Sequence, residues 1–203
     1  MRLIIVRHGE TTWNEKRILQ GVSETELTPR GIWQAECIAA RLEPMQIDGV
    51  ISSSLRRALD TAKAIATLGK FNLQTDAVLR EMDFGAWEGK TFEEISKLYP
   101  EQFLRWRKAP DQHRVSEKAE RIDEVWLRLQ PLLQRLQEEN EEACYVLVTH
   151  TIPAKLMIAA SMGLPFDRIH SLRLENASMS IADWNKERNV LCLMNDVSHL
   201  KER

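Results

Sequence analysis

Residues 3–10, Leu-Ile-Ile-Val-Arg-His-Gly-Glu, combine a predicted strand with the charged and polar groups that follow it. The four apolar residues at positions 3–6 form a continuous run, which is typical of a strand buried on both faces of a parallel sheet. Arg7 and His8 come next, at the carboxyl end of that strand. Open parallel sheets bind their ligands at this end, so the stretch predicts an α/β fold with a functional site beside the first strand.

A second predicted strand ends in the same way. Residues 145–148, Tyr-Val-Leu-Val, form another apolar run, and Thr149, His150 and Thr151 follow directly. A single histidine at such a position is more often structural than catalytic. Two of them at the carboxyl ends of two strands are hard to explain by packing, so the pair favours a functional role for both His8 and His150.

The rest of the chain alternates predicted strands with predicted helices, which indicates right-handed βαβ units and a mostly parallel sheet. Thr28 and Pro29 are typical of a helix start, because threonine caps free N–H groups and proline at the first position loses no hydrogen bond. The apolar stripe of this helix is expected at Ile32, Ala35, Ile38, Ala39 and Leu42. The other expected elements are strands at 47–51, 178–184 and 189–194 and helices at 55–68, 122–136 and 153–162.

A single α/β domain that spans the whole chain is expected, with three layers: a mostly parallel central sheet and helices on both of its faces. Residues 82–120 form an excursion from this core, with a loop at 84–89 and short helical pieces at 92–98 and 101–107. Pro131 lies inside the long predicted helix and removes one of its hydrogen bonds, so we expect a kink or a break there.

The composition is that of a globular protein with balanced charge. Among 203 residues, 28 Lys and Arg stand against 30 Asp and Glu, which gives a formal net charge of −2, and 43% of the residues are hydrophobic. A general nucleic-acid binder would carry a strong basic excess. We therefore expect no nucleic-acid partner, and any site for a polyanion must be a local pocket.

Cysteine usage and hydropathy favour a cytoplasmic protein. Cys37, Cys144 and Cys192 are widely spaced and form no C-x-x-C pair, so neither a disulfide framework nor a zinc site is predicted. No apolar run is long enough for a signal peptide or a membrane span. We expect reduced thiols and no membrane partner.

Two histidines beside an arginine suggest either metal ligation or nucleophilic catalysis. No Asp or Cys falls at ligand spacing to complete a metal site, and Arg7 would repel a cation, so no bound metal is expected. A neutral imidazole can instead attack phosphorus, while guanidinium groups neutralise the oxygens of the transferred group. Arg57 supplies a second guanidinium in the first turn of a predicted helix, where backbone N–H groups also favour anions.

Seven blocks spread over nearly the whole chain carry a family resemblance. They are Arg-His-Gly-Glu-Thr-Thr-Trp-Asn at 7–14, Gln-Gly at 20–21, Leu-Thr-Pro-Arg-Gly at 27–31, Ser-Ser-Leu-Arg-Arg-Ala at 53–58, Leu-Arg-Glu-Met-Asp-Phe-Gly-Ala-Trp-Glu-Gly at 79–89, Val-Thr-His at 148–150 and Asn-Asp-Val-Ser-His-Leu at 195–200. Together and in this order, they resemble the histidine phosphatase superfamily, in its phosphoglycerate-mutase-like branch. The resemblance implies the α/β fold of that branch and phosphoryl transfer through a histidine.

Carried over residue by residue, the resemblance makes His8 the nucleophile that becomes phosphohistidine. Arg7, Arg57 and His150 would bind the phosphoryl oxygens. Glu81 would protonate the leaving alkoxide and later activate water. The sequence around Glu81 agrees with this role, because its apolar neighbours would raise the pKa of the carboxyl group toward the range that suits an acid catalyst.

The resemblance also implies contacts with the substrate from Asn14, Gln20, the backbone of Gly21 and the N–H of Thr151. Most relatives have glycine directly after the second histidine, where this chain has Thr151. In this variant, the chain resembles the cofactor-independent phosphoserine phosphatases. Those enzymes have a histidine where this chain has Phe84, so their contacts with the amino-acid part of the substrate are not carried over to this chain.

Five other residues receive individual expectations. Arg121, which stands in the family's Gly-Glu-Ser loop, is expected as a solvated helix-start residue rather than a ligand for an additional anionic group of the substrate. Trp87 is expected to line the pocket, Trp126 to lie in the core and His170 to be structural. His199 belongs to a tail that resembles one folding back over the pocket in relatives.

The leading hypothesis is a metal-independent phosphomonoesterase that hydrolyses a small phosphorylated metabolite without a cofactor. A mutase of the same fold is an alternative, although the mutases it resembles are usually longer and have an Arg-x-Tyr-Gly pattern where this chain has Asp83-Phe84-Gly85. A phospho-ligand-binding module without turnover is another, and it predicts loss of His8 or Glu81, which are both present. Phosphoserine, α-ribazole phosphate and sugar phosphates stay open as substrates, and the closing strands could pair two chains into a homodimer.

Overall fold

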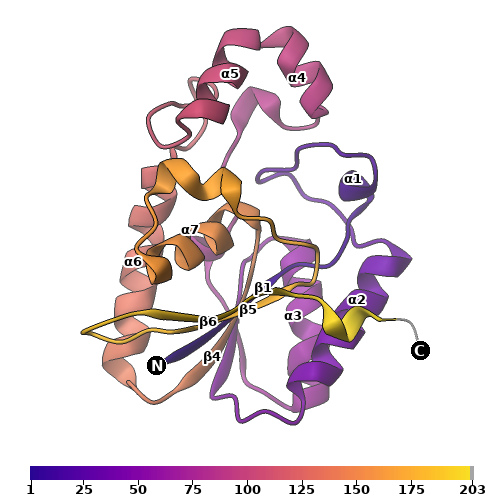
Figure 1. The fold of residues 1–203 in the computed structure, drawn as a ribbon. Coiled ribbons are helices and arrows are strands. Elements are labelled where there is room, and N and C mark those ends of the chain that lie inside the picture. The colour runs from indigo at the N-terminus through magenta and orange to yellow at the C-terminus, as the bar shows by residue number, and fades with distance from the viewer. Residues whose placement is uncertain (202–203) are drawn as a thin grey trace.

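A six-stranded sheet in the order β3-β2-β4-β1-β5-β6 forms the middle of the molecule, in a computed structural model that describes residues 1–201 (Figure 1). Strands β1 to β4 run parallel, whereas β5 is antiparallel to β1 and β6 is antiparallel to β5. The strands are β1 (Arg2–Arg7), β2 (Gly49–Ser52), β3 (Leu73–Thr75), β4 (Cys144–Thr149), β5 (Met179–Asp183) and β6 (Val190–Asp196). The expected α/β architecture is confirmed, and the strand that the sequence missed is β3, which has only three residues.

Four long helices cover the two faces of this sheet. Helices α2 (Pro29–Leu42) and α3 (Arg56–Gly69) lie on one face, and α6 (Ile122–Glu139) and α7 (Thr151–Met162) lie on the other (Figure 1). Thr28 caps α2 as predicted, because its side chain accepts a hydrogen bond from the N–H of Gly31. Within residues 1–201, no helix has both the length and the apolar character that crossing a membrane requires.

Strand β1 is central because its side chains are buried on both faces. Leu3 and Ile5 belong to the apolar cluster on the side of α6 and α7, whereas Ile4 and Val6 belong to the cluster on the side of α2 and α3. Successive side chains of a strand point to opposite faces, so a continuous apolar run serves both layers at once. The carboxyl end of β1 is thereby fixed in position within the core.

One local expectation about α2 is wrong, and of the two outcomes expected at Pro131 the break does not occur. Ile32 is 51% exposed, because Gly31 takes the buried position in that turn of α2. A Cβ at Gly31 would lie 2.0 Å from the carbonyl oxygen of Glu10, so the glycine permits a close approach to the loop after β1. The break expected in α6 is absent, since the helix continues through Pro131 and is held by its buried apolar face.

Residues 82–120 form a cap beyond the carboxyl end of the sheet (Figure 1). The cap contains the short 3₁₀ helix η2 (Gly85–Trp87) and the helices α4 (Phe92–Leu98) and α5 (Pro100–Lys108), close to the predicted pieces. Trp87 is fully buried among the rings of Tyr99, Phe103 and Trp106, so the expectation that it lines the pocket is wrong. The other short elements are α1 (Thr12–Glu15), η1 (Ala77–Leu79), η3 (Phe166–Ser171) and η4 (Ser198–Leu200).

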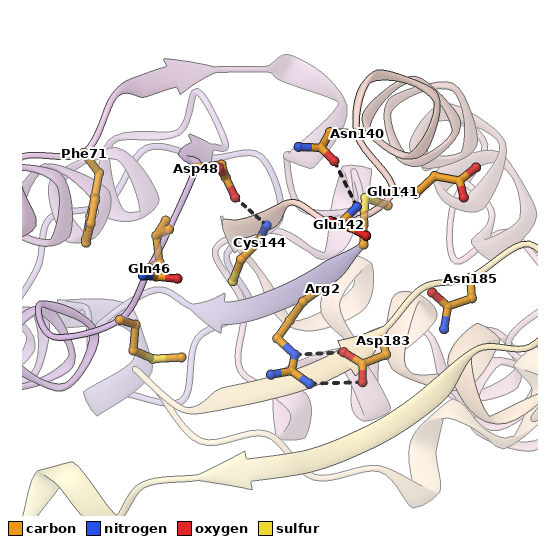
Figure 2. Close-up of a pocket in the computed structure, with 13 residues that line it drawn as sticks. Arg2, Gln46, Asp48, Phe71, Asn140, Glu141, Glu142, Cys144, Asp183 and Asn185 are labelled. Carbon is orange, nitrogen blue, oxygen red and sulfur yellow. Dashed lines mark hydrogen bonds and ion pairs between the residues drawn. The ribbon is translucent and has the colours of Figure 1, made fainter.

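A wide hollow of about 1040 Å³ lies at the opposite end of the sheet, where the parallel strands begin. Arg2 forms a bidentate ion pair with Asp183 there, and Asp48 accepts a hydrogen bond from the N–H of Cys144 (Figure 2). These polar groups already have partners within the protein. The hollow at the carboxyl end is smaller, but several buried polar atoms in or beside it have no partner within the described residues.

Candidate active site

The predicted site residues meet in a cavity of about 640 Å³ at the carboxyl ends of the parallel strands, beneath the cap. Eight of them line it: Arg7, His8, Asn14, Gln20, Gly21, Arg57, Glu81 and Thr151. His150 lies beside His8, with the centroids of the two rings 5.1 Å apart. The residues come from segments as far apart as positions 7 and 151, and parallel strand ends bring them together.

His8 has one ring nitrogen in use and one free. Its Nδ1 lies 2.7 Å from the carbonyl oxygen of Gly9, and a carbonyl can only accept, so Nδ1 carries the proton and donates. Nε2 therefore keeps its lone pair. Burial is the main cause that lowers the pKa of His8 well below 6.5, and the nearby Arg57 and Arg7 add to it. The ring is neutral at pH 7, with Nε2 available as a nucleophile.

His150 has the reverse arrangement of free and bonded nitrogens. Its Nε2 lies 2.7 Å from the hydroxyl oxygen of Ser53, at the end of β2, and its buried Nδ1 has no partner among the described residues. Burial lowers the pKa of His150 well below 6.5, and the positive charge of Arg57 lowers it further. When the Ser53 hydroxyl donates to Nε2, Nδ1 carries the hydrogen and can donate to an anion.

Arg57 is a buried cation that is held by uncharged groups. It is 1% exposed, and its two terminal nitrogens donate to the carbonyl oxygens of Gly21 and Ser23, at 2.7 and 2.8 Å. It makes no ion pair with any residue in 1–201. Burial lowers the pKa of Arg57 to about 10, so the side chain remains positive at pH 7. Its charge is left for a ligand to neutralise.

Arg7, which also lies near His8, repeats this arrangement. One terminal nitrogen donates to the carbonyl oxygen of Leu174 at 2.6 Å, and burial lowers the pKa of the guanidinium. The Nε atoms of Arg7 and Arg57 are both buried without a partner in the described chain. A buried donor that lacks an acceptor costs about 1–3 kcal/mol, so the pair of guanidinium groups favours an anion that accepts from both.

Glu81 lies at the N-terminus of α7, close to the two histidines. One carboxyl oxygen accepts from the N–H groups of Met82 and Ile152, and the other accepts from Thr151 at 2.9 Å. Burial raises the pKa of Glu81, and this effect outweighs the hydrogen bonds and the guanidinium groups, which lower it. The N–H of Thr151, expected to contact substrate, donates instead to Glu81 and orients this carboxyl group.

Two amide side chains present donors to the cavity because their oxygens are already occupied. The amide oxygen of Asn14 accepts from the backbone and hydroxyl of Thr11 and from Asn176. The amide oxygen of Gln20 accepts from the hydroxyl of Thr25 at 2.6 Å. In both amides the NH₂ group is then the one left to serve as a donor, which suits the oxygens of a phosphate.

Glu88 of the cap bonds to the loop at residues 21–23, whose carbonyl oxygens orient Arg57. Its carboxylate accepts from the N–H groups of Val22 and Ser23 at 3.0 and 3.1 Å, and from the hydroxyl of Ser23. It also accepts from the N–H of Phe84 within the cap. The carbonyls of this same loop fix the guanidinium of Arg57, so Glu88 connects the cap to the anion-binding centre.

Three cations that line the cavity were missed by the sequence analysis: Arg17, Arg107 and Lys155. Lys155 could have been found, because it follows Thr151 by four residues on a predicted helix and so shares its face. His170, expected to be structural, also lines the cavity, with its ring centroid 4.4 Å from that of Trp106.

The tail does not fold over the cavity within the described residues. η4 contacts α2, and Nε2 of His199 bonds to the carbonyl of Ala177, so the expectation for the tail is wrong up to residue 201. Arg121 pairs with Asp123 at the start of α6 and lies outside the cavity lining. Trp126 is partly buried against the core, as expected.

Comparison with known proteins agrees with this geometry. Residues 3–197 match the family model described as histidine phosphatase superfamily (branch 1). The chain belongs to this superfamily. A phosphoserine phosphatase 1 of Hydrogenobacter thermophilus is 32% identical over 203 residues, which cover all of this chain and 95% of the relative. A probable phosphoglycerate mutase, GpmB, of Proteus mirabilis is 34% identical over 212 residues, which cover all of this chain and 96% of the relative.

A solved structure has nearly the same fold over its whole length. Bacillus stearothermophilus YhfR superposes with a TM-score of 0.91 at 30% identity, over 98% of this chain and 99% of that one. This structural likeness over the whole length agrees with the family match. The protein is a phosphoric monoester hydrolase of the histidine phosphatase superfamily.

The contacts of Glu88 predict a measurable loss when it is changed. Glu88→Gln keeps the shape but weakens the bonds to the loop at 22–23, so we expect kcat/KM for a phosphomonoester to fall about tenfold, with melting temperature little changed. Glu93→Gln, on the exposed face of the same cap, is the matched control. If Glu88 acts through Arg57, its loss will not add to that of Arg57→Lys in the double variant. Additive losses would contradict this coupling.

Proposed function

We propose that the protein hydrolyses a small phosphomonoester through a phosphohistidine intermediate on His8, with Glu81 as acid and then base. The observation that supports this most directly is that Nε2 of a neutral His8 is free near two guanidinium groups that lack ion-pair partners within residues 1–201. Attack on a phosphate dianion needs such a combination, since the nucleophile must be unprotonated while the oxygens are neutralised.

In the first step, the lone pair of His8 Nε2 attacks phosphorus and the bond from phosphorus to the ester oxygen breaks. Arg7, Arg57 and the Nδ1–H of His150 donate to the three phosphoryl oxygens, where charge is spread in the transition state. An alkoxide is a poor leaving group, so the protonated Glu81 gives its proton to the departing oxygen as the bond breaks. The alcohol leaves, and Glu81 becomes a carboxylate.

In the second step, that carboxylate takes a proton from a water molecule as the water oxygen attacks phosphohistidine. The bond from phosphorus to Nε2 breaks, inorganic phosphate is released, and His8 and Glu81 return to their starting protonation states. The same carboxyl group serves both steps because its pKa is raised by burial, so its acid form is regenerated in each cycle. All groups in both steps belong to the protein, so no metal or cofactor is required by the proposal.

Return of the phosphoryl group to the substrate is a second candidate activity, favoured by the 34% identity to the probable mutase of Proteus mirabilis. Both activities would share the first step and differ in what attacks phosphohistidine. With 3-phosphoglycerate as substrate, a mutase yields 2-phosphoglycerate and a phosphatase yields inorganic phosphate. Analysis of both products in one reaction separates the two.

The first test measures phosphate release from a panel of phosphomonoesters in the presence of EDTA. We expect turnover to persist in EDTA and to fall to background in His8→Ala, because the variant has no nucleophile at the position of Nε2. His113→Ala is a matched control in the cap, outside the cavity lining. Turnover that requires a metal, or that survives in His8→Ala, would refute the phosphohistidine route.

A second prediction concerns pH and the leaving group. Since burial raises the pKa of Glu81, its acid form persists above pH 4.5, and kcat/KM for an alkyl phosphate should fall as rising pH removes that proton. Glu81→Gln should lower that rate by about 10²–10⁴-fold and remove this alkaline limb. With p-nitrophenyl phosphate, whose leaving group needs no proton, the variant should release one rapid equivalent of nitrophenol and then turn over slowly. Equal losses on both esters, without a burst, would contradict the acid–base role.

A further inference from the structure

The cavity extends beyond the groups that would hold the phosphate. Its outer wall is mostly apolar, formed by Ile18, Leu19, Phe84, Phe103, Trp106 and Ile152. Three cations stand in this wall, Arg17, Arg107 and Lys155, while Glu81 is the one acidic residue in the lining described for residues 1–201. The organic part of a substrate would thus meet apolar surface with positive charge set into it.

Lys155 differs from the other two cations because it is partly buried. Arg17 and Arg107 are exposed, so water solvates their charges. Arg107 also lies over the ring of Phe103. Lys155 projects from α7 among buried helix residues, and burial lowers the pKa of its ammonium group. No residue within 1–201 forms a hydrogen bond or an ion pair with its side chain.

The charged groups near Lys155 do not explain why an ammonium group lies in this cavity wall. Arg7 repels it, and His170 is near enough for the lysine to lower the pKa of that imidazole. Glu81 is the nearby acid, but its oxygens already accept from the N–H groups at the start of α7, and its pKa is raised. Partial burial of an ammonium group without a counter-ion costs free energy, and an anionic group on a ligand would offset that cost.

Helix α7 sets the distance between Lys155 and the groups that would bind the phosphate. Thr151 bonds to Glu81 at the first turn of α7, and Lys155 follows four residues later on the same face, about 6 Å further along the axis. Arg7, Arg57 and His150 already provide donors for the transferred group. An anion at Lys155 would therefore belong to a different part of the same substrate.

We infer that Lys155 is a specificity-determining residue that binds a second anionic group, a carboxylate or a second phosphate, on the organic part of the substrate. This inference rests on the proposed phosphomonoesterase function and narrows it to one class of esters. Compact and flexible, the ammonium suits either group as a point charge. The apolar wall around it strengthens the attraction by excluding water.

The test compares esters that differ only in the second charge. One pair is 3-phosphoglycerate and glycerol 1-phosphate, which differ by a carboxylate, and the other is fructose 1,6-bisphosphate and fructose 6-phosphate, which differ by a phosphate. In the wild type we expect a higher kcat/KM for the doubly anionic member of at least one pair. Lys155→Met should lower that ratio by about 10- to 100-fold, mainly through KM, because a charge-assisted bond is lost. Lys155→Arg should restore most of the ratio.

Controls distinguish this inference from the function on which it rests. Lys186→Met removes the same charge from an exposed turn at the far end of the sheet and should leave the ratio as in the wild type. An equal loss on both members of each pair would overturn the inference, because Lys155 would then serve the shared phosphate, while His8-dependent hydrolysis would still stand. Wild-type protein that hydrolyses other phosphomonoesters but no doubly anionic member of either pair would overturn the inference and leave the proposed function standing.

Discussion

Two buried guanidinium groups without carboxylate partners are the constraint on which the rest of the site depends. Arg57 is held by the carbonyls of Gly21 and Ser23, and Arg7 by that of Leu174, so each is oriented without being neutralised. Keeping such charges out of water is costly, and the core formed around β1 supplies the rigidity that prevents them from turning outward. The fold therefore maintains a place for an anion by leaving its positive charge uncompensated.

The protonation states of the other groups follow from this charge and from burial. Burial and the two arginines keep His8 neutral, which leaves it a lone pair. Burial raises the pKa of Glu81, although those same arginines lower it. A carboxylic acid can therefore exist beside a neutral imidazole. In the mechanism that we propose, His8 is the nucleophile and Glu81 is the acid, and an arriving phosphate dianion would accept from Arg7, Arg57 and His150 together.

The sequence predicted those features that local pattern determines. The apolar run before Arg7 and His8 predicted β1 and its site-bearing end, and the Thr28-Pro29 pair predicted the start of α2. The roles expected for Trp87 and the tail were wrong, because burial within the cap and docking onto α2 depend on contacts between distant segments. The sequence does not indicate Lys155 and Glu88 for the same reason, because their importance depends on neighbours that are distant in sequence. For Lys155, the helical spacing from Thr151 is a usable signal.

Direct detection of the phosphorylated chain tests the central claim most sharply. Glu81→Gln protein would be mixed with p-nitrophenyl phosphate, quenched within milliseconds into alkaline denaturant, in which phosphohistidine survives, and analysed by intact mass and peptide fragmentation. Our account predicts one phosphoryl group per chain, on His8, that forms in EDTA and is lost on acidification. A burst of nitrophenol with an unmodified chain, or a phosphoryl group on any residue other than His8, would contradict it.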